Sequence, residues 1–191
     1  MKRRLTQALG ASLVFATFGC AWGAYGMYSL GRTDAPWLVG IPLAVTIVLI
    51  VILTRLQRRV EALPSEAANP ALDVRDARGR QIFTLVNLAQ AVAIVAAVKM
   101  LNAQSPELVA PVAAAVVGLH FLVLARPMEM PTHWIAGGLM WFFAFAVVVL
   151  TPRGGWAAFI GAGNAVILWT CYGIELRSVL AGLLRHRDSA P

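Results

Sequence analysis

Five polar residues lie inside long apolar stretches of this sequence, where a side chain that forms hydrogen bonds is costly without a partner. An amide, imidazole or carboxyl group in such a place can bind a small solute, carry a proton or hydrogen-bond across a helix interface. These residues are the candidates for chemistry in this chain, and we call them the polar seam. They are Asn87, Gln90, His120, Asn164 and Glu175.

The spacing of the polar seam places its members on common helix faces. Asn87 and Gln90 are three residues apart and therefore share one face of a helix. Asn164 and Glu175 are eleven residues apart, and eleven steps of about 100° return nearly to the same face. Together with the span order given below, this spacing predicts that the five side chains approach one another in the cytoplasmic half of a helical bundle.

Each of these residues also has a purely structural interpretation. In that interpretation the amides of Asn87, Gln90 and Asn164 only hydrogen-bond across helix interfaces. Glu175 pairs with an arginine at the level of the lipid headgroups, and His120 is a packing histidine. Residue types and spacing leave both interpretations open.

No motif of a known enzyme class accompanies the polar seam. The sequence contains no P-loop, HExxH, GxSxG, CxxC or dinucleotide-binding pattern. His120, Glu129 and His133 could ligate a metal, but their spacing matches no recognised ligand set, and Pro127 and Pro131 interrupt the segment. Haem ligation needs paired histidines, and only His120 falls within a predicted span. We therefore expect no metal and no cofactor.

The elements that must position these residues are long apolar helices. Of the 191 residues, 59% are hydrophobic and 13% are charged, which is too little polar surface for a water-soluble domain. Runs of about 18 or more apolar residues cross a bilayer as helices, and these runs do not alternate as barrel strands do. The prediction is an all-α membrane protein, a six-transmembrane-helix bundle built from three antiparallel hairpins. The predicted spans are Ala8–Leu30, Trp37–Thr54, Gln81–Leu101, Leu108–Ala125, Trp134–Thr151 and Trp156–Leu176.

The distribution of charge predicts the orientation of these spans. Nearly all of the 16 Lys and Arg residues fall in segments on one side of the membrane, with Arg32, Lys99 and Arg153 as the exceptions. Positive charge marks the cytoplasmic side, so both termini are predicted to be cytoplasmic. Residues 55–80 form a cytoplasmic loop, in which Asn69 and Pro70 are expected to start a short helix. Residues 177–191 form an amphipathic cytoplasmic tail.

The net charge of +7 follows from this topology and from attraction to anionic lipid headgroups, so no nucleic-acid partner is expected. The excess of Arg over Lys, with abundant Ala, is typical of a GC-rich bacterial genome, which indicates the bacterial inner membrane. Residues 1–191 are predicted to form one membrane domain, because the longest loop is shorter than the ~40 residues that an independent domain needs.

The first span has an alternative interpretation as a secretion signal. Basic residues precede its apolar run, and the segment 17–20 resembles a lipoprotein cleavage site that ends at Cys20. However, Phe18 is bulky where a small residue is usual. The apolar run also continues through Leu30, beyond the about 7–15 residues of a typical signal. We therefore predict that the span is retained and that Cys20 is unmodified.

One segment carries a family resemblance. Gly118-Leu-His-Phe-Leu-Val-Leu-Ala-Arg-Pro127, followed by His133-Trp134, resembles a pattern in small uncharacterised bacterial multi-pass membrane proteins. In that pattern a Gly-Leu-His-Phe stretch ends a span and leads into a short basic loop. The resemblance implies a membrane protein and carries no activity.

Three classes of function remain for such a protein. The basic loop and tail favour an accessory or structural role through membrane partners or anionic lipid headgroups. The alternative is a small-solute or proton transporter, or a channel-like protein, that uses the polar seam. A membrane-embedded enzyme is the third class. Whether the protein forms a homo-oligomer or binds another membrane protein stays open.

Overall fold

Six long helices dominate the part of the chain that the structure describes. The computed structural model describes residues 1–31, 35–64 and 70–188. All six helices in this part are long and apolar enough to cross a membrane, which confirms the predicted all-α membrane bundle. Short 3-10 helices, η1 (Pro36–Val39), η2 (Pro106–Leu108) and η3 (Arg153–Gly155), precede the second, fourth and sixth. The long helices are α1 (Lys2–Ser29), α2 (Gly40–Glu61), α3 (Pro70–Leu101), α4 (Val109–Met128), α5 (Pro131–Leu150) and α6 (Trp156–Asp188).

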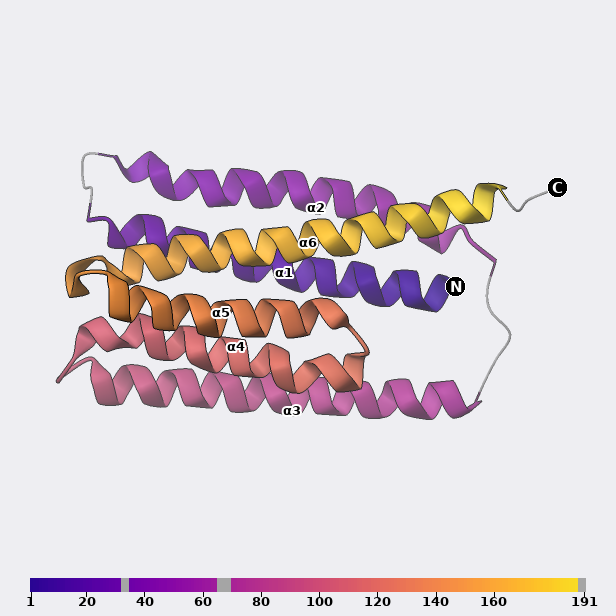
Figure 1. The fold of residues 1–191 in the computed structure, drawn as a ribbon. Coiled ribbons are helices and arrows are strands. Elements are labelled where there is room, and N and C mark those ends of the chain that lie inside the picture. The colour runs from indigo at the N-terminus through magenta and orange to yellow at the C-terminus, as the bar shows by residue number, and fades with distance from the viewer. Residues whose placement is uncertain (32–34, 65–69, 189–191) are drawn as a thin grey trace.

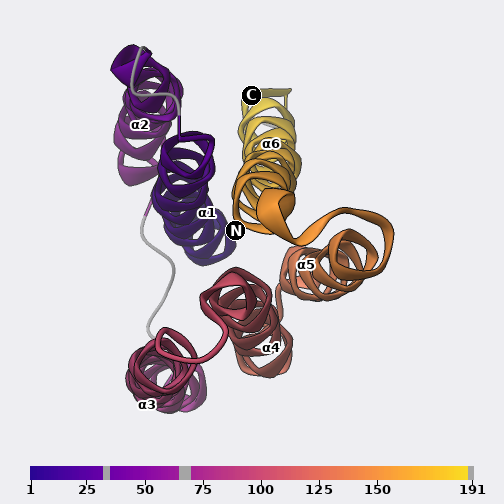
Figure 2. The same ribbon diagram turned by 90° about the vertical axis from the view of Figure 1, so that its left-hand side faces the viewer.

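The helices lie side by side in an open arc. Seen along the bundle, their order is α2, α1, α6, α5, α4 and α3 (Figure 2). The three expected hairpins are present, since α1 contacts α2, α3 contacts α4, and α5 contacts α6. The most extensive interface in the described chain nevertheless joins α1 to α6, which are far apart in sequence. The core, with Phe15, Phe121, Met140 and Leu168 fully buried, therefore lies among α1, α4, α5 and α6.

Glycines allow α1 and α6 to pack at backbone contact. A Cβ atom added at Gly161 would lie 2.4 Å from the Cα atom of Gly26, and one added at Gly23 would lie 3.4 Å from the Cβ atom of Ala165. Small residues at such positions let membrane helices approach closely, and the van der Waals contact then holds them together. Small residues of the first and last helices thus form the central interface of the bundle.

Two helices begin at a proline that precedes the predicted span. Pro70 begins α3, where its missing N–H needs no partner, and the helix continues without a break to Leu101. The expected separate short helix is therefore wrong; Asn69 lies outside the described residues. Pro131 begins α5 for the same reason, and this brings Thr132 and His133 into the helix.

The turn between α4 and α5 is a Schellman motif with an unusual residue in it. The N–H of Met130 donates to the carbonyl of Ala125, and the N–H of Glu129 donates to that of Arg126. Glu129 has a φ of 53°, in the left-handed region where glycine is usual, and no other described non-glycine residue has a positive φ. This conformation ends α4 abruptly and reverses the chain into α5.

The helices have unequal lengths, and the difference falls at one end of the bundle. The α4 and α5 helices have 20 residues each, whereas α3 has 32 and α6 has 33. Figure 1 shows that α3, α6 and α1 extend past the α4–α5 turn, at the end where α1 begins and α6 ends. We call this the basic end. Its basic residues are Lys2, Arg3, Arg4, Arg55, Arg58, Arg59, Arg75, Arg78, Arg80, Arg126, Arg177 and Arg185.

Residues 177–188, the described part of the expected tail, continue α6 without interruption. Val179 is fully buried, and a Cβ atom added at Gly182 would lie 2.8 Å from a methyl carbon of Leu5. The apolar side of this segment therefore packs against the start of α1. Its cytoplasmic location stays a prediction.

Candidate functional site

Glu175 is the one acidic member of the polar seam, and it is buried on α6. The hydroxyl of Thr132 on α5 donates a hydrogen bond to its carboxylate. Thr132 lies in the first turn of α5, where unpaired N–H groups and the helix dipole favour a nearby negative charge. The thiol of Cys171 approaches the backbone carbonyl of Thr132 at 3.9 Å. Glu175 therefore joins α6 to the start of α5, and its partner is a hydroxyl group instead of the expected arginine.

His120 on α4 and His133 on α5 flank a shared aromatic ring. The ring centroid of Phe121 lies 5.4 Å from that of His120 and 5.5 Å from that of His133. Phe15 of α1 completes this cluster, 5.4 Å from Phe121 and 5.3 Å from His133. Both imidazoles are buried, and both nitrogens of His120 and Nδ1 of His133 have no hydrogen-bond partner.

The three amides of the polar seam have different environments. Asn87 is half-buried and donates to the carbonyl of Phe83 on its own helix, at 2.7 Å. Gln90 is buried with Oε1 unpartnered, and Asn164 is fully buried with neither amide atom bonded. A buried amide with no partner is unusual in a folded protein and calls for an explanation.

No hydrogen bond in the described chain joins two members of the polar seam. Asn164 and Glu175 lie on one continuous helix, about 16 Å apart along its axis at 1.5 Å per residue. His120 and Glu175 both approach the first turn of α5, His120 through the ring of Phe121 that contacts His133, and Glu175 through Thr132. That the five residues act as one site stays a prediction.

Sequence reasoning overlooked two buried residues at the start of α5. Thr132 and His133 are each 3% exposed, although the predicted span begins only at Trp134. The signal that could have found them is Pro131, because proline is preferred at the first position of a helix. The described residues hold no cluster of three potential metal ligands, and Glu129 is engaged by Arg75 instead of approaching the histidines.

A cavity of about 500 Å³ opens at the basic end, between α1, the start of α3 and the α4–α5 turn. Ligand-binding pockets have volumes of roughly 300–1,000 Å³. Four arginines line the cavity: Arg3, Arg4, Arg75 and Arg80. Its remaining lining residues include Gln7, Gly10, Ala11, Val14, Gly79, Phe83, Met128, Glu129 and His133.

The cavity follows from the unequal helix lengths. Gly79 of α3 lies beside the carbonyl of Pro127, near the end of α4, so the residues before Gly79 extend beyond α4. Across the gap, α1 continues past the α4–α5 turn to Lys2. These two helices therefore face each other at the basic end with no helix between them.

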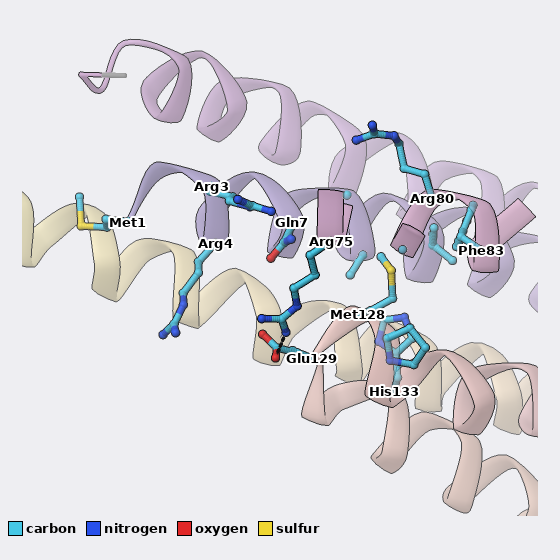
Figure 3. Close-up of a pocket in the computed structure, with 15 residues that line it drawn as sticks. Met1, Arg3, Arg4, Gln7, Arg75, Arg80, Phe83, Met128, Glu129 and His133 are labelled. Atoms are coloured by element: carbon cyan, nitrogen blue, oxygen red, sulfur yellow. Dashed lines mark ion pairs between the residues drawn. The ribbon is translucent and has the colours of Figure 1, made fainter. Parts of the chain in front are cut away.

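An ion pair crosses the mouth of this cavity. The guanidinium group of Arg75 on α3 pairs with the carboxylate of Glu129 at the α4–α5 turn. Figure 3 shows Arg75 reaching down to Glu129, with Gln7 and Arg3 of α1 beside it. Arg4 and Arg80 have no ion pair within the described part of the chain. Positive charge therefore exceeds negative charge among the residues that line the cavity.

Charge and apolar surface are separated along the cavity. Arg3 and Arg4 lie at its mouth, and Val14 lies about 15 Å further along α1 at 1.5 Å per residue. Small or apolar residues line the inner part, where His133 contributes a buried Nδ1 atom without a partner. The arrangement suits a molecule with an anionic head and an apolar body.

Fold and cavity together define the class as a polytopic α-helical membrane protein with a basic, amphipathic cavity at one end. Comparisons with protein-family models, with curated proteins and with solved structures give no significant match to this chain.

Proposed function

We propose that the protein is an accessory or structural component of the bacterial inner membrane that acts through anionic lipid headgroups. In this proposal both termini and the basic end are cytoplasmic. The observation that carries it is the basic end itself, where twelve described Lys and Arg residues from five helices gather and four arginines line a cavity with an apolar interior. Cytoplasmic leaflets rich in anionic lipid attract such clusters by about 1 kcal/mol per basic residue.

The helix surfaces support the same proposal. The peripheral α2 and α3 helices expose Ile47, Val48, Leu85, Leu88 and Val92, each by more than half. Such side chains are stable in lipid and would be unfavourable in water. The resemblance of residues 118–134 to small bacterial multi-pass membrane proteins agrees with this environment.

Lipid dependence of stability tests the proposal. The purified protein is reconstituted in nanodiscs of zwitterionic lipid with and without an anionic phospholipid, and thermal unfolding is followed. Binding to the folded state raises the unfolding temperature, so the anionic discs are expected to stabilise the protein, and less so at high salt. Equal unfolding temperatures in both discs would contradict the proposal.

A second function, proton or small-solute transport through the polar seam, has its own support. The unpartnered polar atoms of Gln90, His120 and Asn164 are the kind of groups that line ion and solute pathways. Proteoliposomes with a pH-sensitive dye inside test it. Proton flux that is lost on His120→Phe, in a protein that remains folded, would support transport, and flux equal to empty liposomes would count against it.

A further inference from the structure

We propose that the cavity at the basic end binds one molecule of an anionic glycerophospholipid, with its phosphate at the arginines and an acyl chain between α1 and α3. The inference rests on the proposed function and deepens it, because it assigns the lipid contact to a single site. Three independent observations at this cavity carry it.

The first observation concerns the mouth. Arginine binds phosphate oxygens through paired N–H donors, and four arginines line this one cavity. The Glu129 carboxylate already pairs with Arg75, so it occupies a position that an anionic headgroup would take. Glu129 is also held in a left-handed conformation that is costly for a non-glycine residue. Glu129 is therefore a built-in competitor of the lipid phosphate.

The second observation concerns the inner part of the cavity. Ala11, Val14 and Phe83 form an apolar lining, and His133 presents a 3% exposed imidazole whose Nδ1 has no partner. A glycerophospholipid carries ester carbonyls below its phosphate, where they can accept a hydrogen bond from an imidazole N–H. The inner part of the cavity therefore offers an apolar lining for an acyl chain, with the imidazole of His133 beside it.

The third observation is the empty space at Gly10. This residue lines the cavity, and a Cβ atom added to it would meet no atom within 4 Å. Glycine within a helix is unfavourable, and here no neighbouring helix requires it. A larger side chain at this position would fill the cavity without displacing protein atoms.

The experiment measures lipid binding to the full-length protein in an uncharged detergent by native mass spectrometry. The probes are phosphatidylglycerol and phosphatidylcholine with the same chains, and inorganic phosphate as competitor. One phosphatidylglycerol is expected to bind, about tenfold or more tighter than phosphatidylcholine, since a charge-assisted contact is worth roughly that factor. Inorganic phosphate at the same concentration is expected not to displace it, because phosphate lacks the acyl chain.

Gly10→Leu and Gly138→Leu are the matched variants. Gly138 is exposed on α5, also has nothing within 4 Å of an added Cβ atom, and does not line the cavity. Gly10→Leu is expected to lower the affinity about tenfold or more while thermal stability is kept or raised, because leucine favours a helix. Gly138→Leu is expected to leave binding unchanged. Equal binding by both variants would overturn the proposal.

Charge variants separate this site from the general basic surface. Arg80→Gln is expected to weaken phosphatidylglycerol binding about tenfold, whereas Arg58→Gln, at the basic end but outside the cavity, should not. Glu129→Gln is expected to strengthen binding. If Arg58→Gln weakens binding as much as Arg80→Gln, the single site fails and the proposed function stands. If phosphatidylglycerol and phosphatidylcholine bind equally, both fail.

Discussion

Glu175 has a partner that its sequence context does not reveal. Its carboxylate accepts a hydrogen bond from Thr132, which lies 43 residues earlier at the start of α5. A buried carboxylate is stable only with such donors, and the positive end of a helix dipole adds to the effect. The contact therefore fixes the start of α5 against α6 and gives the buried carboxyl group a hydrogen-bond partner.

Replacement of Thr132 by valine should destabilise the protein. Valine keeps the shape and removes the donor, so the buried carboxylate loses its hydrogen bond, at a cost of about 1–3 kcal/mol. Thr132→Ser retains a hydroxyl group and should lose much less. Thermal unfolding in detergent measures both, and equal unfolding temperatures for the two variants would contradict this account.

Asn164 gives a test that separates packing from function within the polar seam. Both of its amide atoms are buried and unpartnered, so Asn164→Leu, which keeps the branched shape and the number of side-chain heavy atoms, should raise stability by about 1–2 kcal/mol. The preceding residue, Gly163, packs on Phe143 and is therefore kept as glycine in this variant. If Asn164→Leu instead destabilises the protein, the amide has a partner, such as a water molecule, in the membrane.

At this scale the sequence predicts which residues are buried but not what they contact. Gln90, His120, Asn164 and Glu175 are all buried, as expected of polar groups that avoid lipid. Their neighbours depend on helix starts and on rotation about each axis, and one proline moves Thr132 and His133 into α5. The spacing of residues along one helix does not reveal where the neighbouring helices begin or how they are rotated.

The interface between α1 and α6 joins the two ends of the sequence. Gly26 and Gly161 meet there backbone to backbone, so neither position has room for a side chain. Small residues that recur three or four apart in the two helices allow such packing. The pairing of the first with the last helix was not predictable, because many spans of membrane proteins carry the same pattern.

Gly161→Ala should therefore weaken the bundle. The added Cβ atom would lie 2.4 Å from Gly26 Cα, which belongs to the backbone and cannot rotate away. Overpacking of this kind typically costs about 1–3 kcal/mol. The matched control is Gly173→Ala on the same helix, where an added Cβ atom meets nothing within 4 Å. A Gly161→Ala variant with the thermal stability of Gly173→Ala would show that the helices adjust.

The orientation of the whole molecule follows from charge and is open to direct measurement. Native Cys20 and Cys171 are replaced by serine, and single cysteines are introduced at Ala62 and Gly154, which are exposed at opposite ends of the bundle. An impermeant thiol reagent applied to intact cells should label position 154 and not position 62. The reverse pattern would place the basic end outside and overturn the proposed function.

At the scale of the molecule, apolar runs were sufficient to predict the six helices. The structure adds what hydropathy cannot detect, namely the charged extensions of α1, α3 and α6 beyond the predicted spans. The cavity depends on those extensions, on the early end of α4 at Glu129 and on the open arc of helices. The cavity could therefore not be predicted from the sequence, although its arginines belong to the basic segments that the sequence places on one side of the membrane.

The short α4 and α5 helices make the molecule sensitive to hydrophobic mismatch. At 1.5 Å per residue their 20 residues measure about 30 Å, close to the thickness of a hydrocarbon layer. The longer α3 and α6 can match a thicker bilayer by tilting less, but the α4–α5 turn would then sink below the headgroups. Glu129 and Arg75 would enter hydrocarbon, and the cavity mouth would lose contact with water. The acyl chain length of the surrounding lipids should therefore control access to the cavity.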